Sequence, residues 1–180
     1  MNTIALFGGS FDPPHTGHIA IINALEKLDY IDKIIVMPTF LNPFKSRSHA
    51  PSVLRLQWLK CILWDYQNVL IDDHEIKLEK KVPTIESVEY LLKKYQKIFI
   101  VIGADNLETL GQWNRYSELK EKVSFIIASR EKIEIPEEFI QIKVDVDISS
   151  SKLREVMDRT KLPKKCAQEI AQYYKETDAR

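Results

Sequence analysis

The residues best suited to chemistry lie in one segment near the start of the chain, Gly8 to His18, which reads GGSFDPPHTGH. Its adjacent glycines, Gly8 and Gly9, allow the backbone to pass close to a ligand. His15 and His18 are three residues apart, so they face the same side of a helical turn. Two imidazoles there can donate hydrogen bonds to a developing negative charge. The segment therefore predicts a site for an anion of phosphate size.

Other interpretations of this segment are open. It lacks the third glycine of G-x-G-x-x-G and the Gly-Lys-Ser/Thr ending of a P-loop, so it is neither of the common phosphate loops. One alternative is a turn whose histidines are incidental. Another is a zinc site on His15 and His18, which needs a further ligand, and no other cysteine or histidine is near in sequence. We therefore expect no metal held by side chains.

The elements that must position this segment show in the pattern of apolar residues. Short runs rich in Ile and Val predict strands buried on both faces, as in a parallel sheet. These runs are Thr3–Phe7, Lys33–Met37, Ile98–Ile102 and Val123–Ala128, with weaker candidates at Val69–Asp72 and Gln141–Val146. Segments with helical spacing alternate with them: His18–Leu28, Val53–Trp64, Thr84–Tyr95, Ser150–Asp158 and Pro163–Tyr174.

This alternation predicts an α/β fold, a Rossmann-like open parallel sheet with helices on both faces. Ligands of such sheets bind beyond the carboxyl ends of the strands, where the segment 8–18 lies. At 180 residues we expect a single domain over 1–180, with a helical C-terminal part at about 149–176. The stretch Pro38–Pro51, with three prolines, is predicted to be a long mobile loop and a candidate lid.

The composition argues against several classes of protein. The 26 basic and 26 acidic residues cancel, which disfavours a general nucleic-acid binder. No apolar run approaches the roughly 18 residues that cross a bilayer, and Ile4–Phe7 is too short for a signal-peptide core. Cys61 and Cys166 cannot build a disulfide framework. We expect a cytoplasmic protein without membrane or nucleic-acid partners, and the sequence leaves homo-oligomerisation open.

Two motifs resemble those of a known superfamily. Residues 9–18, GSFDPPHTGH, resemble the signature of the HxGH nucleotidyltransferases. Residues 148–155, ISSSKLRE, are similar to that superfamily's C-terminal I-S-S-T-x-[IV]-R motif. Backbone amides and hydroxyls at a helix start, with the forked guanidinium of Arg154, suit a polyphosphate. The resemblance implies the HxGH nucleotidyltransferase fold.

Further matches resemble one family within it, the bacterial nicotinate-nucleotide adenylyltransferases. They are residues 103–107, GADNL, with Trp113 ten positions after Gly103, and residues 128–130, ASR. The chain departs from the family where Asn42 and Phe44 replace a proline and a histidine, and where residues 82–84, VPT, replace S-Y-T. The resemblance implies an enzyme of NAD biosynthesis that transfers AMP from ATP to nicotinate mononucleotide, giving deamido-NAD and pyrophosphate.

The resemblance also implies roles for individual residues. The catalytic residues would be His15, His18, Lys45 and Arg154. ATP would be bound by Gly8, Gly9, Ser10, Phe11, His15, His18, Gly103, Asp105, Ile148, Ser149, Ser150 and Arg154. The mononucleotide would be bound by Thr84, Trp113 and Arg130. Mg²⁺ is expected to accompany ATP, carried mainly by phosphate and water oxygens.

Several rival functions remain open on sequence alone. Phosphopantetheine adenylyltransferases share the superfamily but usually have threonine where this chain has His15, and cytidylyltransferases usually carry R-T-x-G before the second motif. Nicotinamide mononucleotide as acceptor differs from nicotinate by one polar contact. A silent ATP- or NAD-sensing module is the non-enzyme alternative, although it would need neither histidine. Trp113 alone would more often be a core residue.

Overall fold

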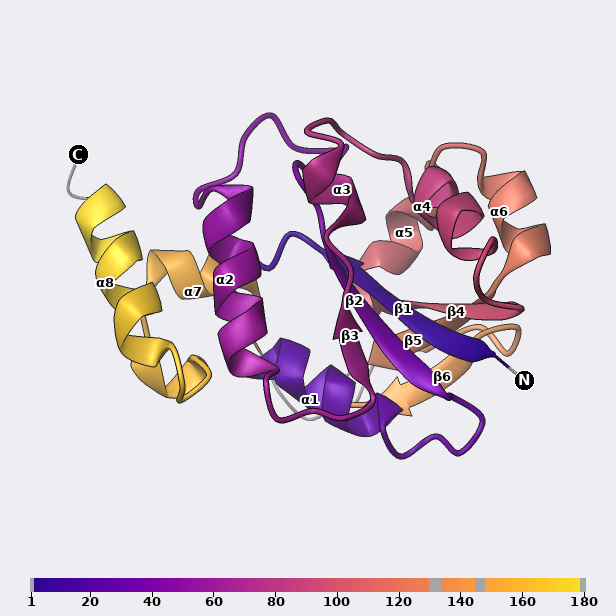
Figure 1. The fold of residues 1–180 in the computed structure, drawn as a ribbon, viewed down its shortest axis with the longest axis horizontal. Coiled ribbons are helices and arrows are strands. Elements are labelled where there is room, and N and C mark those ends of the chain that lie inside the picture. Colours follow the sequence, from indigo (N-terminus) through magenta and orange to yellow (C-terminus); the bar gives the residue numbers. More distant parts are fainter. Residues whose placement is uncertain (1, 130–133, 145–147, 179–180) are drawn as a thin grey trace.

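The computed structural model describes residues 2–129, 134–144 and 148–178. At its centre is a six-stranded sheet in the order β3-β2-β1-β4-β5-β6, in which every neighbouring pair is parallel (Figure 1). The strands are β1 (Thr3–Gly9), β2 (Lys33–Pro38), β3 (Val69–Ile71), β4 (Lys97–Gly103), β5 (Ser124–Ser129) and β6 (Ile140–Lys143). The predicted Rossmann-like α/β fold is confirmed, and all six predicted strands are present within one or two residues where described.

Helices connect the strands and cover both faces of the sheet. They are α1 (Thr16–Leu25), α2 (Ser52–Ile62), α3 (His74–Lys77), α4 (Thr84–Leu91), α5 (Leu107–Leu110), α6 (Tyr116–Lys122), α7 (Ser150–Glu155) and α8 (Ala167–Asp178), with short 3₁₀ turns η1 (Ala104–Asn106) and η2 (Arg159–Lys161). The sequence predicted α1, α2, α4, α7 and α8. It did not predict α3, α5 and α6, which are four to seven residues long and too short for a helical period to show.

The core lies on the two faces of the sheet, and the alternating side chains of β1 divide between them. Ala5 and Phe7 pack on the face covered by α1, α2 and α8. Ile4 and Leu6 pack on the opposite face, where α4 and α6 supply buried Ile85, Val88, Leu91 and Leu119. Burial on both faces explains why the strand sequences are continuous apolar runs.

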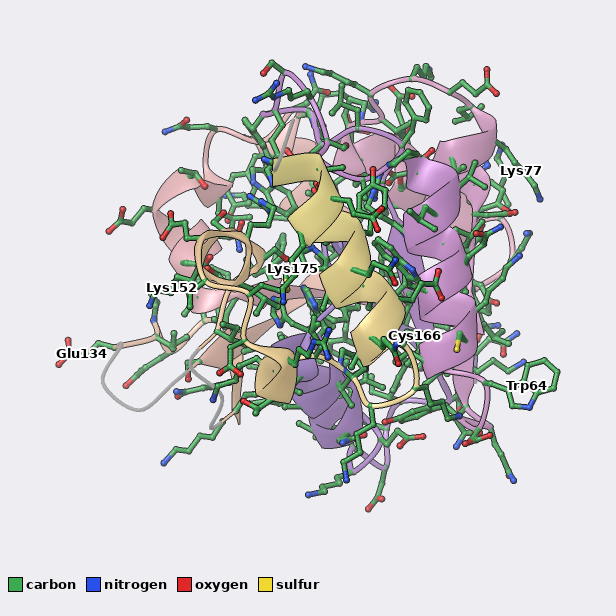
Figure 2. All side chains as sticks on the ribbon, turned by 90° about the vertical axis from the view of Figure 1, so that its left-hand side faces the viewer. Trp64, Lys77, Glu134, Lys152, Cys166 and Lys175 are labelled. Atoms are coloured by element: carbon green, nitrogen blue, oxygen red, sulfur yellow. The ribbon has the colours of Figure 1, made fainter. Side chains whose placement is uncertain are left out.

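The C-terminal helix α8 packs beside α2, as Figure 2 shows from the side. Trp58 of α2 is buried and its Nε1 donates a hydrogen bond to Glu169 Oε1 of α8 at 2.9 Å. Trp64, just after α2, points away from the protein and is 83% exposed. The packing of α8 on α2 brings the end of the chain next to the loop that follows β1.

The sheet order places β1 and β4 side by side at the centre. From β1 the chain turns to β2 on one side, and from β4 it turns to β5 on the other. A crevice opens at such a reversal, beyond the carboxyl ends of the strands, and there this fold class binds ligands.

Within the described ranges, no helix is both long and apolar enough to cross a membrane.

Candidate active site

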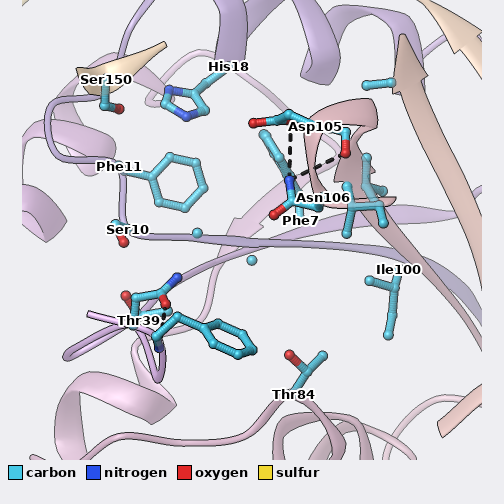
Figure 3. Close-up of a pocket in the computed structure, with 18 of the residues that line it drawn as sticks. Phe7, Ser10, Phe11, His18, Thr39, Thr84, Ile100, Asp105, Asn106 and Ser150 are labelled. Atoms are coloured by element: carbon cyan, nitrogen blue, oxygen red, sulfur yellow. Dashed lines mark hydrogen bonds between the residues drawn. The ribbon is translucent and has the colours of Figure 1, made fainter. Parts of the chain in front are cut away.

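A cavity of about 940 Å³ lies at the reversal point between β1 and β4. Its size matches that of small-molecule sites. Figure 3 shows Ser10, His18 and Ser150 on one side, Asp105 and Asn106 across from them, and Thr84 at another part of the wall. Thr39 Oγ1 and Glu75 Oε2 are buried, line this cavity, and have no hydrogen-bond partner among the described residues. Buried polar atoms without a partner are uncommon in folded proteins, so these two oxygens single out this part of the wall.

The segment after β1 holds the two histidines against each other. The rings of His15 and His18 stack with centroids 3.7 Å apart, and the ring of Phe11 packs edge-on to His18 at 4.8 Å. Phe11 has a φ of 49°, in the left-handed region, and this strain is held by its buried ring. Gly17 is required because a Cβ there would lie 2.9 Å from His15 Nδ1.

The hydrogen bonding of His18 fixes which ring nitrogen can donate. The backbone N–H of His15 donates to His18 Nδ1 at 3.1 Å. Burial, and then the nearby His15, lower the pKa of His18 well below its usual value, so the ring is neutral at neutral pH. Since Nδ1 accepts a hydrogen bond, the proton of the neutral ring is on Nε2. His18 is therefore a preorganised N–H donor in the cavity wall.

The start of α7 is bound to the same loop. Ser149 caps α7 by accepting from the backbone N–H of Lys152 at 3.2 Å, and Ser150 Oγ donates to the carbonyl of Pro13 at 2.9 Å. Arg154 Nη1 donates to the backbone carbonyl of Asp12, and its Nη2 donates to Ser151 Oγ at 3.2 Å. The second motif of the sequence thus lies directly against the first.

A buried arginine joins the loop after β1 to the loop after β2. Arg55 of α2 is fully buried. Its Nη1 donates to the carbonyl of Ser10 and its Nε to that of Ala50 at 3.1 Å. Its Nη2 donates to the carbonyls of Thr39 and Phe40 at 2.8 and 2.9 Å. One guanidinium therefore fixes both ends of the loop 39–50 and the start of the segment 8–18, which we name the phosphate segment.

Asp12 completes this arrangement, and we name Asp12, Arg55 and Tyr174 the Asp12 cluster. The Asp12 carboxylate accepts backbone N–H bonds from His49 and Ala50 at 2.8 and 2.9 Å and a hydroxyl bond from Tyr174 of α8. Burial would raise the pKa of Asp12, but the hydrogen bonds from Tyr174, His49 and Ala50 and the charge of Arg55 outweigh it and lower the pKa. Asp12 is thus a buried anion that ties α8 to the phosphate segment.

Across the cavity, the chain after β4 turns tightly at Gly103. A Cβ at Gly103 would lie 2.4 Å from Asp105 Oδ1, so glycine is what lets the carboxylate fold back over the strand end. Asn106 Nδ2 donates to Gly103 O and to Asp105 Oδ1, both at 3.3 Å. Asp105 is exposed toward solvent at the cavity edge and can accept from hydroxyl groups.

A further part of the wall is formed by α3, α4 and the turn of Trp113. Thr84, the first residue of α4, lines the cavity, and no described side chain caps that helix. Glu75 of α3 is 6% exposed, and its Oε1 accepts from Ser87 Oγ of α4 at 2.6 Å. Burial raises the pKa of Glu75 to about 7. Trp113 is half-buried, packs against the core and also lines the cavity, so the core and ligand interpretations both stay open.

The cavity brings together most of the residues predicted from the sequence. Those that line it are Gly8, Gly9, Ser10, Phe11, His15, His18, Lys45, Thr84, Gly103, Asp105, Trp113, Ile148, Ser149 and Ser150. Arg154 does not line it, because its guanidinium binds the loop instead. It is nonetheless near Lys45: partial burial and the charge of Arg154 lower the pKa of Lys45. Arg130 lies outside the described residues.

The Asp12 cluster and Glu75 were not assigned from the sequence. Tyr174 was predicted only as part of an apolar stripe, and it is buried as expected. A signal did exist for Arg55, which is three residues before buried Trp58 and four before buried Leu59, on the same side of α2. An arginine on an apolar helix face needs buried partners.

Comparison with known proteins first gives the broad family and the fold. Residues 6–156 match the model of the cytidylyltransferase-like family, a range that includes both motifs and every strand from the middle of β1 onward. A solved structure of Plasmodium falciparum nicotinic acid mononucleotide adenylyltransferase complexed with NaAD has the same fold, with a TM-score of 0.73 at 19% identity over 99% of this chain and 97% of that one.

Relatives with similar sequences identify one family within this broad family. A probable nicotinate-nucleotide adenylyltransferase of Sulfurimonas denitrificans is 59% identical, over 98% of this chain and 97% of the relative. One of Nitratiruptor sp. is 46% identical, over 96% and 98%. The chain belongs to the nicotinate-nucleotide adenylyltransferase family, and the predicted family is confirmed.

Proposed function

We propose that this protein transfers AMP from ATP to nicotinate mononucleotide, giving deamido-NAD and pyrophosphate in NAD biosynthesis. The observation that carries this is the single continuous cavity. Both histidines, the glycine-rich segment, Asp105, Thr84 and Trp113 line it together, so two nucleotides can meet within one continuous cavity.

In the proposed reaction the phosphate oxygen of the mononucleotide attacks the α-phosphorus of ATP in line. The new oxygen–phosphorus bond forms as the bond to the β-phosphate bridge breaks, and pyrophosphate leaves with that bridging oxygen. His18 Nε2–H, with His15 beside it, donates to the charge that develops on the α-phosphoryl oxygens. Holding the two reactants in line can contribute about 7–11 kcal/mol to catalysis.

The other roles follow from position in the wall. We propose that Ser10 and the backbone of 8–11, with the start of α7, hold the phosphates of ATP. Lys45 and Arg154, which lie close enough that the charge of Arg154 lowers the pKa of Lys45, neutralise the leaving pyrophosphate. Gly103 and Asp105 take the adenosine ribose. Arg130 remains a predicted ligand of the mononucleotide phosphate.

The pyridine ring of the acceptor is proposed to stack on Trp113 near the start of α4. The uncapped first turn of α4 presents the positive end of the helix dipole at Pro83 and Thr84, both in the wall. A negative group is favoured at such a position, which supports the acid over the amide as acceptor. Proline, in place of the family's tyrosine at position 83, is the N-cap residue of α4, where its missing N–H costs the helix no hydrogen bond.

Mg²⁺ is proposed to enter with ATP and to neutralise part of the triphosphate charge. In the ranges that the structure describes, no three His, Cys, Asp or Glu side chains are grouped to hold a metal. An ion carried mainly by phosphate and water oxygens needs no such group. EDTA should abolish pyrophosphate release, and added Mg²⁺ should restore it; full activity in EDTA would contradict the proposal. The cytoplasmic location and the absence of nucleic-acid partners stay predictions.

The test of the function is to identify the products. With ATP, Mg²⁺ and nicotinate mononucleotide, mass spectrometry is expected to find deamido-NAD in equal amount to pyrophosphate. ATP that binds without yielding either product would support the sensing module instead.

A further inference from the structure

Glu75 is a buried carboxyl in the wall of the acceptor pocket to which the proposed mechanism gives no task. Its residue is 6% exposed, and it lies on α3 directly after the carboxyl end of β3. Oε1 accepts from Ser87 Oγ at 2.6 Å, while Oε2 is buried without a partner in the described part of the chain. A buried, half-satisfied carboxylate is costly, so the neutral acid is the form that this environment favours.

The partner of Glu75 connects it to the place where the acceptor's acid group would lie. Ser87 is three residues after Thr84, so the two share one side of the first turn of α4, and both line the cavity with Glu75. An ionised Glu75 would set a negative charge beneath the positive end of α4. It would weaken the attraction of that helix end for a carboxylate and would repel the carboxylate directly.

The surroundings of Glu75 supply no compensating cation among the described residues. Asp72, just before α3, raises its pKa further, and the hydrogen bond from Ser87 acts in the opposite direction. Met37 of β2, Val82, Pro83 and Thr84, which line the same cavity, are uncharged. The titratable and charged residues that line other parts of the cavity are His15, His18, Lys45, Asp105 and Lys152. The charge state of Glu75 is therefore set by burial and not by an ion pair.

We propose that Glu75 determines acceptor specificity, because its buried carboxyl must be neutral for a carboxylate-bearing acceptor to bind next to α4. Neutral Glu75 accepts from Ser87 on Oε1 and keeps its proton on Oε2. An amide-bearing acceptor is uncharged at this position and is indifferent to the ionisation of Glu75. The inference rests on the proposed function and adds a pH-dependent preference to it.

The test compares nicotinate and nicotinamide mononucleotide as acceptors from about pH 6 to about pH 8.5. The quantity compared is kcat/KM with nicotinate mononucleotide divided by kcat/KM with nicotinamide mononucleotide. Both acceptors carry the same phosphate, so this ratio cancels the titration of that phosphate and of the ATP site. In the wild type, this ratio is expected to fall about fivefold or more as the pH rises through 7, since a full unit of pKa coupling corresponds to about tenfold. The pyridine carboxylate stays ionised throughout.

Glu75→Gln provides the decisive variant, because an amide reproduces the neutral acid and can still accept from Ser87. Its ratio is expected to stay within about twofold across the same range, at the value of the wild type near pH 6. Glu86→Gln is the matched control: it removes a carboxylate from the same turn of α4, but from an exposed residue paired with Lys80 at 3.4 Å. It should keep the wild-type pH dependence.

A Glu75→Gln ratio that falls with pH as in the wild type would overturn the inference while leaving the proposed function intact. A wild-type ratio that does not change with pH would do the same. Loss of turnover with both acceptors in the wild type at every pH would overturn the proposed function, and the inference with it. If Glu75→Gln folds poorly, direct binding of the two acceptors to the wild type over the same pH range gives the same ratio.

Discussion

A hydrogen bond from the backbone holds His18 in the tautomer that can donate from Nε2. The bond from the His15 N–H occupies Nδ1, and burial keeps the ring neutral. A fixed donor that needs no reorganisation during the reaction stabilises a developing charge more than a mobile one does. The same geometry explains why position 17 must be glycine, since any side chain there would displace His15.

Replacing His18 by Ala should lower kcat about 10²- to 10³-fold, the usual cost of losing one preorganised donor to a transition state. The readout is the steady-state rate of pyrophosphate release with saturating substrates. His74→Ala is the control, since His74 stacks on Tyr90 at 3.7 Å and does not line the cavity. Near wild-type turnover by the His18 variant would remove the catalytic role given to it.

The ionisation of Glu75 should also change the free energy of unfolding with pH, which can be measured without substrate. Its pKa in the folded protein, about 7, lies above the ordinary 4.5, so the native state binds more protons than the unfolded state between these values. The contribution of Glu75 to the free energy of unfolding therefore falls as the pH rises from about 4.5 to about 7 and stays low above that.

Glu75→Gln removes that penalty, so we expect the variant to exceed the wild type in free energy of unfolding by about 1–3 kcal/mol at pH 8. The difference should shrink toward pH 5. Urea denaturation at several pH values measures it. A variant that is less stable than the wild type by the same amount at every pH would show that the carboxyl acts only as a packing and hydrogen-bonding group.

At the scale of elements, three segments far apart in the chain meet at the Asp12 cluster. Arg55 brings α2 to the ends of two loops, and Tyr174 brings α8 to Asp12. Every one of these bonds ends on the phosphate segment or on the loop beside it. Tyr174 of the C-terminal helix, 162 residues after Asp12, thereby supports the geometry of the histidines.

Tyr174→Phe should test this support. Losing one buried hydrogen bond to a charged group is expected to lower the free energy of unfolding by about 1–3 kcal/mol and to raise the KM for ATP severalfold as the loop loosens. Tyr173→Phe is the neighbouring control, because its hydroxyl is exposed and donates to the His49 carbonyl at 3.3 Å. A Tyr174 variant that is destabilised with an unchanged KM for ATP would mean that the cluster stabilises the fold without positioning the loop.

The elements also show what the sequence could predict and what it could not. The strands could be predicted because burial on both faces leaves continuous apolar runs. The motif residues of the segment 8–18 could be predicted from residue type and spacing. The partners of Asp12 were not, because Arg55 and Tyr174 are 43 and 162 residues away and meet it only through the packing of α2 and α8. The same holds for Glu75, whose short helix carries no periodic signal.

At the scale of the whole molecule, the loop 39–50 is anchored at both ends and exposed between them. Arg55 holds Thr39 and Ala50, whereas Phe44 is 64% exposed, and Lys45 and Arg47 are exposed as well. Since Phe44 and Lys45 also line the cavity, the middle of the loop is placed to close over bound substrates.

Limited trypsin digestion should report this closure. Cleavage after Lys45 and Arg47 is expected to slow at least severalfold with ATP, Mg²⁺ and nicotinate mononucleotide bound, since an ordered loop is a poor protease substrate. Cleavage after exposed Lys27, in the turn following α1, should be unaffected and serves as the internal control. Equal cleavage of the loop with and without substrates would argue against a lid.

The most direct test of the central claim is the kcat/KM for pyrophosphate release from ATP with three acceptors: nicotinate mononucleotide, nicotinamide mononucleotide and phosphopantetheine. At neutral pH or slightly below, the cavity with its uncapped α4 and neutral Glu75 predicts a clear preference for the nicotinate compound and negligible turnover of phosphopantetheine. A preference for either of the others would contradict the assignment of Thr84, Trp113 and Glu75 to an acid-bearing pyridine.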